Sequence, residues 1–145
     1  MYGLFIAILL CLVAAIAAHE IDRNSRYRDS LGGFWEASHT FCKRAGISRA
    51  SILIDEDRDS AYILIEDGDE MLVNRAVEFT ISPVWTGNLF ARTHTYALNW
   101  DEPVDPLPQS CELRFDPAAG LIGLFEDGTL YLEAFRNARA SAGVV

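Results

Sequence analysis

The acidic run Asp55–Ser60 comes nearest, by residue type, to a metal-binding loop. Glu66 follows Asp55 by eleven residues, and the carboxylates between them have the spacing of ligands in a calcium loop of about twelve residues. That loop needs glycine at its sixth position, where this chain has Ser60, and residues 61–66 have the apolar pattern of a strand. At about 3.3 Å per residue, Glu66 would lie roughly 20 Å from Asp59, too far to share a cation. We therefore predict a solvated hairpin turn and no calcium site.

Histidine and cysteine form the second set of candidate ligands. His39 and Cys42 could combine with His94 and Cys111 in a zinc site of two cysteines and two histidines. The second pair lacks the close spacing typical of such sites, so we predict no metal and no other cofactor. Cys42 and Cys111 are the only cysteines outside the apolar N-terminus, and a disulfide could join them if the domain were lumenal or extracellular. In the cytoplasm both thiols would stay reduced.

Nucleophilic catalysis has no support in the sequence. Serine, histidine and aspartate are present, but no Gly-x-Ser-x-Gly elbow or comparable motif positions them, so we expect a protein that is not an enzyme. The 12 basic and 21 acidic residues give a net charge of −9, which argues against binding to nucleic acid. Half of the residues are hydrophobic, which excludes a disordered chain. The length of 145 residues is enough for one domain.

The N-terminal residues 1–18 form an apolar run without a charged side chain. As a helix rising about 1.5 Å per residue, this run nearly spans a hydrocarbon core of about 30 Å. We predict a single-pass membrane anchor, because the basic cluster Arg23, Arg26 and Arg28 follows it and would hold the domain on the cytoplasmic side. The alternative is a cleaved signal peptide, since residues 15–17 (Ala-Ile-Ala) fit a cleavage site, although no basic residue precedes the run. The domain would then be secreted or lumenal.

The rest of the chain is organised as a polar tether, one domain and a tail. Residues 19–30 are polar and need not fold, residues 31–137 form the domain, and residues 138–145 are predicted to be a flexible tail. A helix is predicted over Ser38–Gly46, because basic residues lie in its last turn and glycine suits its C-cap. Short alternating runs predict strands at 51–55, 61–66, 70–73, 76–82, 89–98, 111–115, 120–125 and 129–135.

The strands are joined by signals for tight turns. Asp67-Gly68 and Asp127-Gly128 tolerate positive φ and favour antiparallel hairpins. The sequence therefore predicts an all-β domain: a single small antiparallel barrel or sandwich of about eight strands with one short helix, preceded by an N-terminal hydrophobic helix. We favour the barrel, because closure removes exposed strand edges. The predicted core consists of Trp35, Ile52, Ile54, Ile63, Ile65, Phe79, Ile81, Phe115, Leu124, Leu130 and Leu132.

Two resemblances to known proteins are visible. Gly33-Phe34-Trp35, placed before the first long strand, resembles the Gly-x-Trp motif that opens lipocalin and calycin barrels. The resemblance implies that Arg136, after the last strand, packs over Trp35 at one barrel end, and that both residues border a ligand site. The second motif of that family is reduced to a trace at Thr95-Tyr96.

The second resemblance covers most of the chain. The apolar N-terminus, residues 33–37 (Gly-Phe-Trp-Glu-Ala), Phe41-Cys42, residues 45–47 and residues 113–117 (Leu-Arg-Phe-Asp-Pro) look like small uncharacterised membrane-anchored β-domain proteins of large DNA viruses. Such proteins have no assigned chemistry, so this likeness implies a location at a membrane more than an activity.

Two functions remain from the sequence alone. We expect a non-enzymatic, membrane-tethered structural or protein-interaction module, bound to a bilayer through residues 1–18 and to an unknown protein partner. Its interaction surface is expected around Trp85 and the loop 101–108. The alternative is a calycin-like carrier that holds a small apolar ligand in the barrel interior, with Trp35 and Arg136 at its closed end.

Overall fold

The structure is a computed structural model that describes every residue except 56, 88–91 and 137–145. The helices are α1 (Tyr2–Tyr27), the 3₁₀ turn η1 (Arg28–Leu31) and α2 (His39–Ala45). The strands are β1 (Gly33–Ala37), β2 (Arg49–Asp55), β3 (Ser60–Asp67), β4 (Glu70–Pro83), β5 (His94–Trp100), β6 (Ser110–Asp116), β7 (Leu121–Glu126) and β8 (Thr129–Arg136). The domain boundary predicted at residue 137 and the predicted tail, 138–145, lie outside the described residues.

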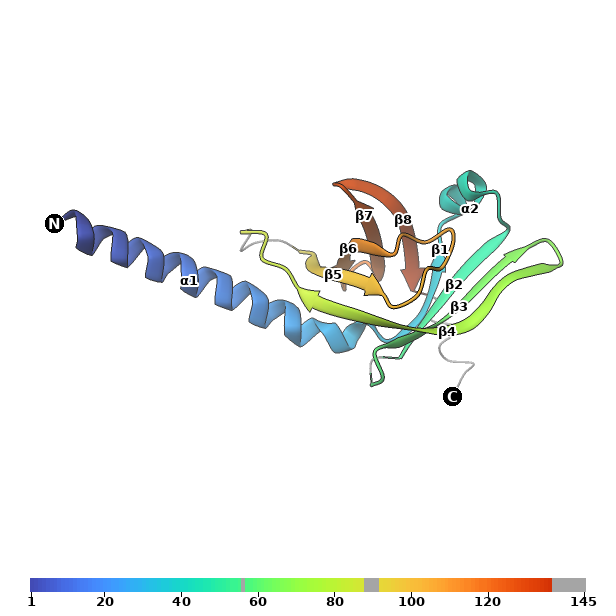
Figure 1. Ribbon diagram of the computed structural model, residues 1–145, viewed down its shortest axis with the longest axis horizontal. Coiled ribbons are helices and arrows are strands. Elements are labelled where there is room, and N and C mark those ends of the chain that lie inside the picture. The colour runs from blue at the N-terminus through green and yellow to red at the C-terminus, as the bar shows by residue number, and fades with distance from the viewer. Residues whose placement is uncertain (56, 88–91, 137–145) are drawn as a thin grey trace.

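The strands close into an antiparallel barrel in which each strand pairs with its neighbours in the sequence (Figure 1). β1 completes the circle by pairing with both β2 and β8, so that Trp35 lies opposite Ile52 on one side and opposite Arg136 on the other. The predicted all-β domain with one short helix is confirmed. Of the two predicted forms, barrel and sandwich, the protein adopts the barrel.

The hairpin turns occur where the sequence predicts them. Asp127 and Gly128 both have positive φ, 52° and 79°, the geometry that a two-residue turn between β7 and β8 requires. Gly68, with φ 62°, begins the turn from β3 to β4. β4 differs from the prediction, because it is one strand of 14 residues in place of two shorter ones. Asn74 and Arg75, between the predicted pieces, continue the pairing with β3.

The core lies inside the barrel and is formed by alternate residues of each strand. Leu130 is the one predicted core residue that is exposed, at 41%, because it lies at the start of β8 beside a bulge at Leu124/Phe125 in β7. Ile54 and Ile81 are partly buried against the core. The other predicted core residues are buried as expected: Trp35, Ile52, Ile63, Ile65, Phe79, Phe115, Leu124 and Leu132.

The short helix α2 packs against the outside of the barrel. Ser38 caps its N-terminus, where the Oγ accepts a hydrogen bond from the Phe41 amide at 3.2 Å, and Gly46 ends it with φ 72°. Phe41 is buried and its ring lies 5.9 Å from that of Tyr131 on β8. The helix predicted over Ser38–Gly46 is therefore confirmed, and it covers one outer face of the barrel.

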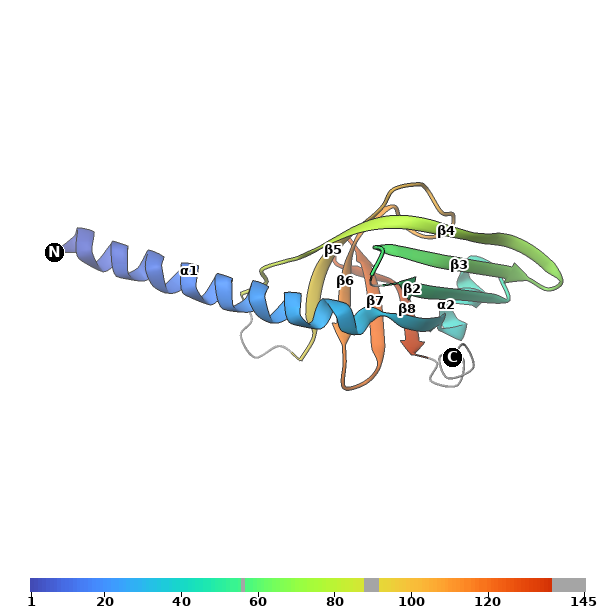
Figure 2. The same cartoon turned by 90° about the horizontal axis from the view of Figure 1, so that it is seen from below.

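Helix α1 is longer than the apolar run that begins it. The sequence predicts a tether over residues 19–30 that need not fold, and this prediction is wrong, because the helix continues to Tyr27 and is followed directly by η1. Glu20 and Asn24, in the supposed tether, are each 1% exposed. Figures 1 and 2 show the N-terminal part of α1 projecting away from the barrel, while its C-terminal turns contact β4 and β5. The polar segment is ordered because its side chains find partners on the barrel.

Candidate functional site

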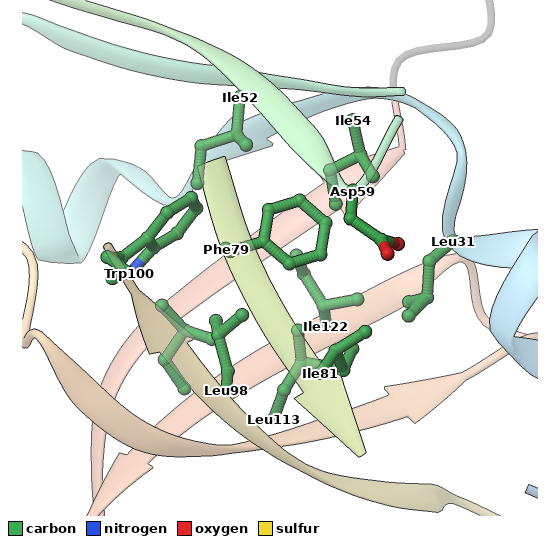
Figure 3. Close-up of a pocket in the computed structure, with 11 residues that line it drawn as sticks. Leu31, Ile52, Ile54, Asp59, Phe79, Ile81, Leu98, Trp100, Leu113 and Ile122 are labelled. Carbon is green, nitrogen blue, oxygen red and sulfur yellow. The ribbon is translucent and has the colours of Figure 1, made fainter. Parts of the chain in front are cut away.

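The barrel interior is an apolar space that side chains almost fill. The remaining cavity has a volume of about 20 Å³, close to what one water molecule requires. Asp59, at the β2–β3 turn, places the one carboxylate among the described lining residues (Figure 3). The lining is otherwise apolar: Leu31, Ile52, Ile54, Phe79, Ile81, Leu98, Trp100, Leu113, Ile122 and Leu124. A drug-sized or lipid-sized ligand would need a pocket of about 300 Å³ or more.

Trp35 and Arg136 meet at one end of the barrel, as the calycin resemblance implies. The Arg136 guanidinium lies 4.6 Å from the centre of the Trp35 ring, within the range of a cation–π contact. Trp35 is fully buried and its Nε1 donates to the Leu31 carbonyl at 2.8 Å, while Arg136 donates to the Ser30 carbonyl. The polar groups of both residues thus bind the η1 backbone, and they fix where the chain enters the barrel. Their predicted contact with a ligand stays a prediction.

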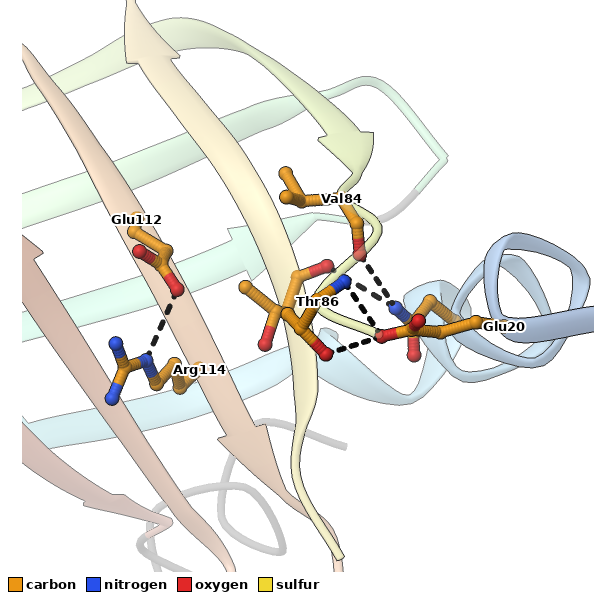
Figure 4. Close-up of polar contacts among 7 residues, drawn as sticks. Glu20, Val84, Thr86, Glu112 and Arg114 are labelled. Atoms are coloured by element: carbon orange, nitrogen blue, oxygen red, sulfur yellow. Dashed lines mark hydrogen bonds and ion pairs between the residues drawn. The ribbon is translucent and has the colours of Figure 1, made fainter. Parts of the chain in front are cut away.

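The contact between α1 and the barrel contains the most extensive buried polar network among the described residues. We call it the junction and define it as Glu20, Asn24, Thr86, His94 and Tyr96. The Glu20 carboxylate accepts hydrogen bonds from the backbone amides of Thr86 and Gly87, both at 3.0 Å, and from the Thr86 hydroxyl (Figure 4). These donors follow the end of β4, where no further strand pairing satisfies them. Three hydrogen bonds to one carboxylate favour its ionised form.

Asn24 extends this network by one helical turn. Its amide nitrogen donates to the carbonyls of Val84 and Thr95, both at 3.4 Å, which turns its oxygen toward His94 Nδ1 at 2.9 Å. His94 must therefore carry its proton on Nδ1 and donate it to Asn24. The Tyr96 hydroxyl donates to the backbone carbonyl of Asn24 at 2.5 Å. Asn24 thus forms hydrogen bonds to the barrel through both its side chain and its backbone carbonyl. These bonds hold the helix in one orientation on the barrel.

The junction also sets the charge of its histidine. His94 is 5% exposed, and its ring stacks on that of Tyr27 with 4.1 Å between centroids. Burial lowers the pKa of the His94 imidazole below its ordinary value of 6.5, and the nearby Arg23 charge lowers it further, whereas Asp116 acts in the opposite direction. The imidazole is therefore neutral at pH 7 and serves as a fixed hydrogen-bond donor.

A groove lies on the outer face between α2 and β8. The Arg44 guanidinium covers the rings of Phe41 and Tyr131, at 6.0 and 5.8 Å from their centroids. Leu130 and Phe135 are 41% and 47% exposed beside it, and the groove has a volume of about 410 Å³. The groove has a mixed lining. Phe41, Leu130, Tyr131 and Phe135 are apolar or aromatic, and the polar lining residues are Ser38, His39, Thr40, Arg44 and Glu133. A surface that combines apolar and polar groups in this way is compatible with a protein contact.

The loop 101–108 does not form the exposed patch expected from the sequence. Val104 and Leu107 are 2% and 7% exposed and belong to the core. Trp85 is 48% exposed, but it lies beside Thr86 at the junction. The expectation of an exposed apolar patch is therefore wrong for the loop. Trp85 is exposed, but the buried loop residues Val104 and Leu107 form no surface patch with it.

The cysteines and histidines weighed as ligands are not gathered. Cys42 and Cys111 are both free thiols, so the disulfide considered from the sequence is not present. Cys42 lies on α2 outside the barrel, whereas Cys111 lies opposite Leu98 in β5 and shares its inward face. Burial raises the pKa of the Cys111 thiol to about 12, and Glu126 adds to the shift. In the part of the chain that the structure describes, no three histidine, cysteine, aspartate or glutamate side chains lie close enough to hold a metal ion.

Sequence reasoning missed the junction, although a signal was present. Glu20, Asn24 and Tyr27 have the i, i+4, i+7 spacing of one helix face, and all three contact the barrel. The polarity of residues 19–30, taken alone, predicts a solvated tether. Its partners are 60 to 72 residues away in the sequence, and no local pattern points to them.

Comparisons with protein-family models, with curated proteins and with solved structures found no match. The resemblances to calycin barrels and to viral membrane-anchored proteins therefore stay predictions. Helix α1 is long and apolar enough to cross a membrane, a test that signal sequences near an N-terminus also pass.

Proposed function

We propose that this protein is a non-enzymatic, single-pass membrane protein that holds a filled β-barrel at the membrane surface for contact with a protein partner. The observation that carries the proposal is the junction, because it joins the apolar helix to the barrel through buried hydrogen bonds. A flexible tether would let the domain sample many orientations. A helix clamped at Glu20 and Asn24 fixes both the orientation of the barrel and its distance from the bilayer.

The depth of the junction supports a membrane location. Glu20 comes two residues after Ala18, the last residue of the apolar run, which is about 3 Å along a helix. Trp85, 48% exposed, neighbours the Thr86 that Glu20 binds, and so it lies at the same level. Tryptophan is enriched at the membrane–water interface, because its apolar ring contacts the lipid while its N–H group contacts water.

The barrel itself supports contact with a protein over transport of a ligand. The interior cavity of about 20 Å³ leaves no space for an apolar cargo. The groove between α2 and β8 instead displays Leu130 and Phe135 on the outer surface. We propose this groove as the contact surface for the partner, with an apolar side chain of the partner packed against Leu130 and Phe135. Arg44 and Glu133 both line the groove, so it can pair with partner charges of either sign.

The membrane location is tested by expressing the full chain, extracting membranes with alkaline carbonate and sequencing the N-terminus of the product. We expect a chain beginning at or next to Met1 that stays in the pellet. As the matched control, Leu9→Arg with Leu10→Arg places two charges in the apolar run and should release the chain. A soluble wild-type product that begins near Ala18 or His19 would show that the helix is a removed signal.

The contact surface is tested by site-specific photocrosslinking from Phe135 in cells. We expect a discrete crosslinked protein that is lost in Leu130→Ser, because that change removes apolar area from the groove. Met71→Ser is the control, since Met71 is also half-exposed, at 50%, but lies at the β3–β4 hairpin. Equal crosslinking in both variants would refute the assignment of this groove.

A further inference from the structure

A second cleft, of about 630 Å³, lies beside the junction. It opens where the last turns of α1 face the start of β5 and the turn between β6 and β7. We call it the basic cleft; its lining residues are Arg23, Arg26, Tyr27, Ser30, Arg92, His94, Pro117 and Ala118. Its volume is within the range of about 300–1,000 Å³ that small-ligand sites occupy.

The charge of the basic cleft is opposite to that of the whole protein. Three guanidinium groups line it, in a chain whose net charge is −9. Arg26 also pairs with Asp22, one helical turn before it. Both side chains are more than half exposed, so this ion pair is weak and solvent ions compete with it. Two further carboxylates act on residues of the cleft, Glu20 on Arg23 and Asp116 on His94, but neither lines the cleft. The described lining of the cleft therefore has three guanidinium groups and no carboxylate.

The position of the basic cleft relative to the apolar run indicates which anion would reach it. Arg23 comes five residues after Ala18, which is about 7.5 Å along a helix. The headgroup layer on each side of a bilayer is about 5–7.5 Å thick, the difference between a total of about 40–45 Å and a core of about 30 Å. If the apolar run fills the core, Arg23 lies at the depth of the lipid phosphates.

We propose that the basic cleft binds the phosphate of an anionic lipid headgroup. This inference rests on the proposed membrane location of α1. A guanidinium presents a planar fork of N–H donors that matches phosphate oxygens, and Arg23 and Arg92 supply such forks from two different elements, α1 and the segment before β5. Ser30 also lines the cleft, and a serine hydroxyl is a neutral hydrogen-bond donor. Binding here would connect the helix, β5 and the β6–β7 turn, and would strengthen the junction.

The experiment is a calorimetric titration of the full chain in a non-ionic detergent. The probes are dihexanoylphosphatidic acid, dihexanoylphosphatidylcholine and inorganic phosphate. We expect phosphatidic acid to bind at least tenfold more tightly than the other two. One basic residue near an anionic lipid corresponds to about fivefold in affinity, so Arg92→Gln should weaken phosphatidic acid binding by about fivefold. Arg49→Gln is the control. It removes the same charge from β2, where Arg49 pairs with Glu36 of β1 at the surface, and it should leave binding unchanged.

The outcomes separate the alternatives. Equal affinity for phosphatidic acid and phosphatidylcholine, or equal binding by wild type and Arg92→Gln, would overturn the site. Inorganic phosphate that binds as tightly as phosphatidic acid would overturn its assignment to a lipid. Arg23→Gln is a second variant from the other wall of the cleft, and near-ultraviolet circular dichroism checks that each variant is folded. The titration in detergent does not depend on whether the chain stays in a membrane. A negative titration therefore refutes only the lipid site, whereas release of the chain by carbonate would refute the membrane location.

Discussion

Glu20→Gln is the substitution that tests the junction most directly. The change keeps the shape of the side chain but replaces one carboxylate oxygen with an NH₂ group. In the protein, one oxygen receives both Thr86 donors and the other receives the Gly87 amide. The glutamine oxygen can keep the Thr86 donors, and its NH₂ group then faces the Gly87 N–H, so that two donors meet where a donor and an acceptor met before.

The magnitude follows from that lost hydrogen bond. A hydrogen bond to a charged group contributes about 1.5–3 kcal/mol to stability. Glu20 is 1% exposed, so water does not replace the bond without opening the junction. At about 1.4 kcal/mol per tenfold change, we expect the equilibrium constant for local opening of the junction to rise by about 10- to 150-fold.

Hydrogen exchange of the Gly87 amide, measured on the full chain in a non-ionic detergent, reports this opening. Exchange at Gly87 should accelerate by the same factor, while amides in β6 and β7 keep their rates. Glu112→Gln is the matched control, because it makes the same chemical change in a partly exposed pair with Arg114 on β6 and should cost less than about 1 kcal/mol. Unchanged exchange at Gly87 in Glu20→Gln would refute the reasoning that the carboxylate holds the helix to the barrel.

The core, the buried histidine and the cysteines give three further predictions. Phe79→Ala removes a ring that lies 5.7 Å from that of Trp100 and should lower the free energy of unfolding by about 3–5 kcal/mol in chemical denaturation; a loss below about 1 kcal/mol would contradict a filled barrel. Because the pKa of His94 is lowered in the folded state, the unfolded chain binds more protons below about pH 6.5, so stability should fall from pH 7.5 to 5.5, and His94→Gln should reduce this slope. Identical slopes would contradict the assignment to His94. With a pKa of about 12, Cys111 should resist iodoacetamide at pH 8 until the chain is unfolded in urea; rapid modification of the folded chain would show that the thiol is not buried.

The barrel could be predicted because its signals are local. The Asp127-Gly128 turn needs positive φ at both residues, and these residue types provide it whatever the rest of the chain does. The alternation of apolar residues in β3 likewise fixes which face of the strand is buried. Closure into a barrel is expected on general grounds, because an open sheet would expose two strand edges.

The candidate sites could be predicted only in part, because they depend on distant partners. The short resemblance at residues 33–35 predicts the contact of Arg136 with Trp35, and the pairing of β1 with β8 places the two residues opposite each other. Glu20 and Asn24 gave no such indication, since a polar residue near a helix end is ordinarily solvated, and only β4 and β5 make burial favourable. Spacing alone also cannot show that Cys111 faces inward while Cys42 lies on an outer helix.

The pairing of β1 with β8 has a consequence for synthesis on the ribosome. Trp35 and Arg136 lie opposite each other although about 100 residues separate them, so the sheet cannot close until β8 has been translated. Until then β1 and the growing edge of the sheet have unpaired backbone groups, which favour aggregation. The apolar run of α1, in contrast, ends at residue 18. A nascent chain therefore exposes its helix long before its barrel can form, and a premature stop before Thr129 would leave an open sheet attached to that helix.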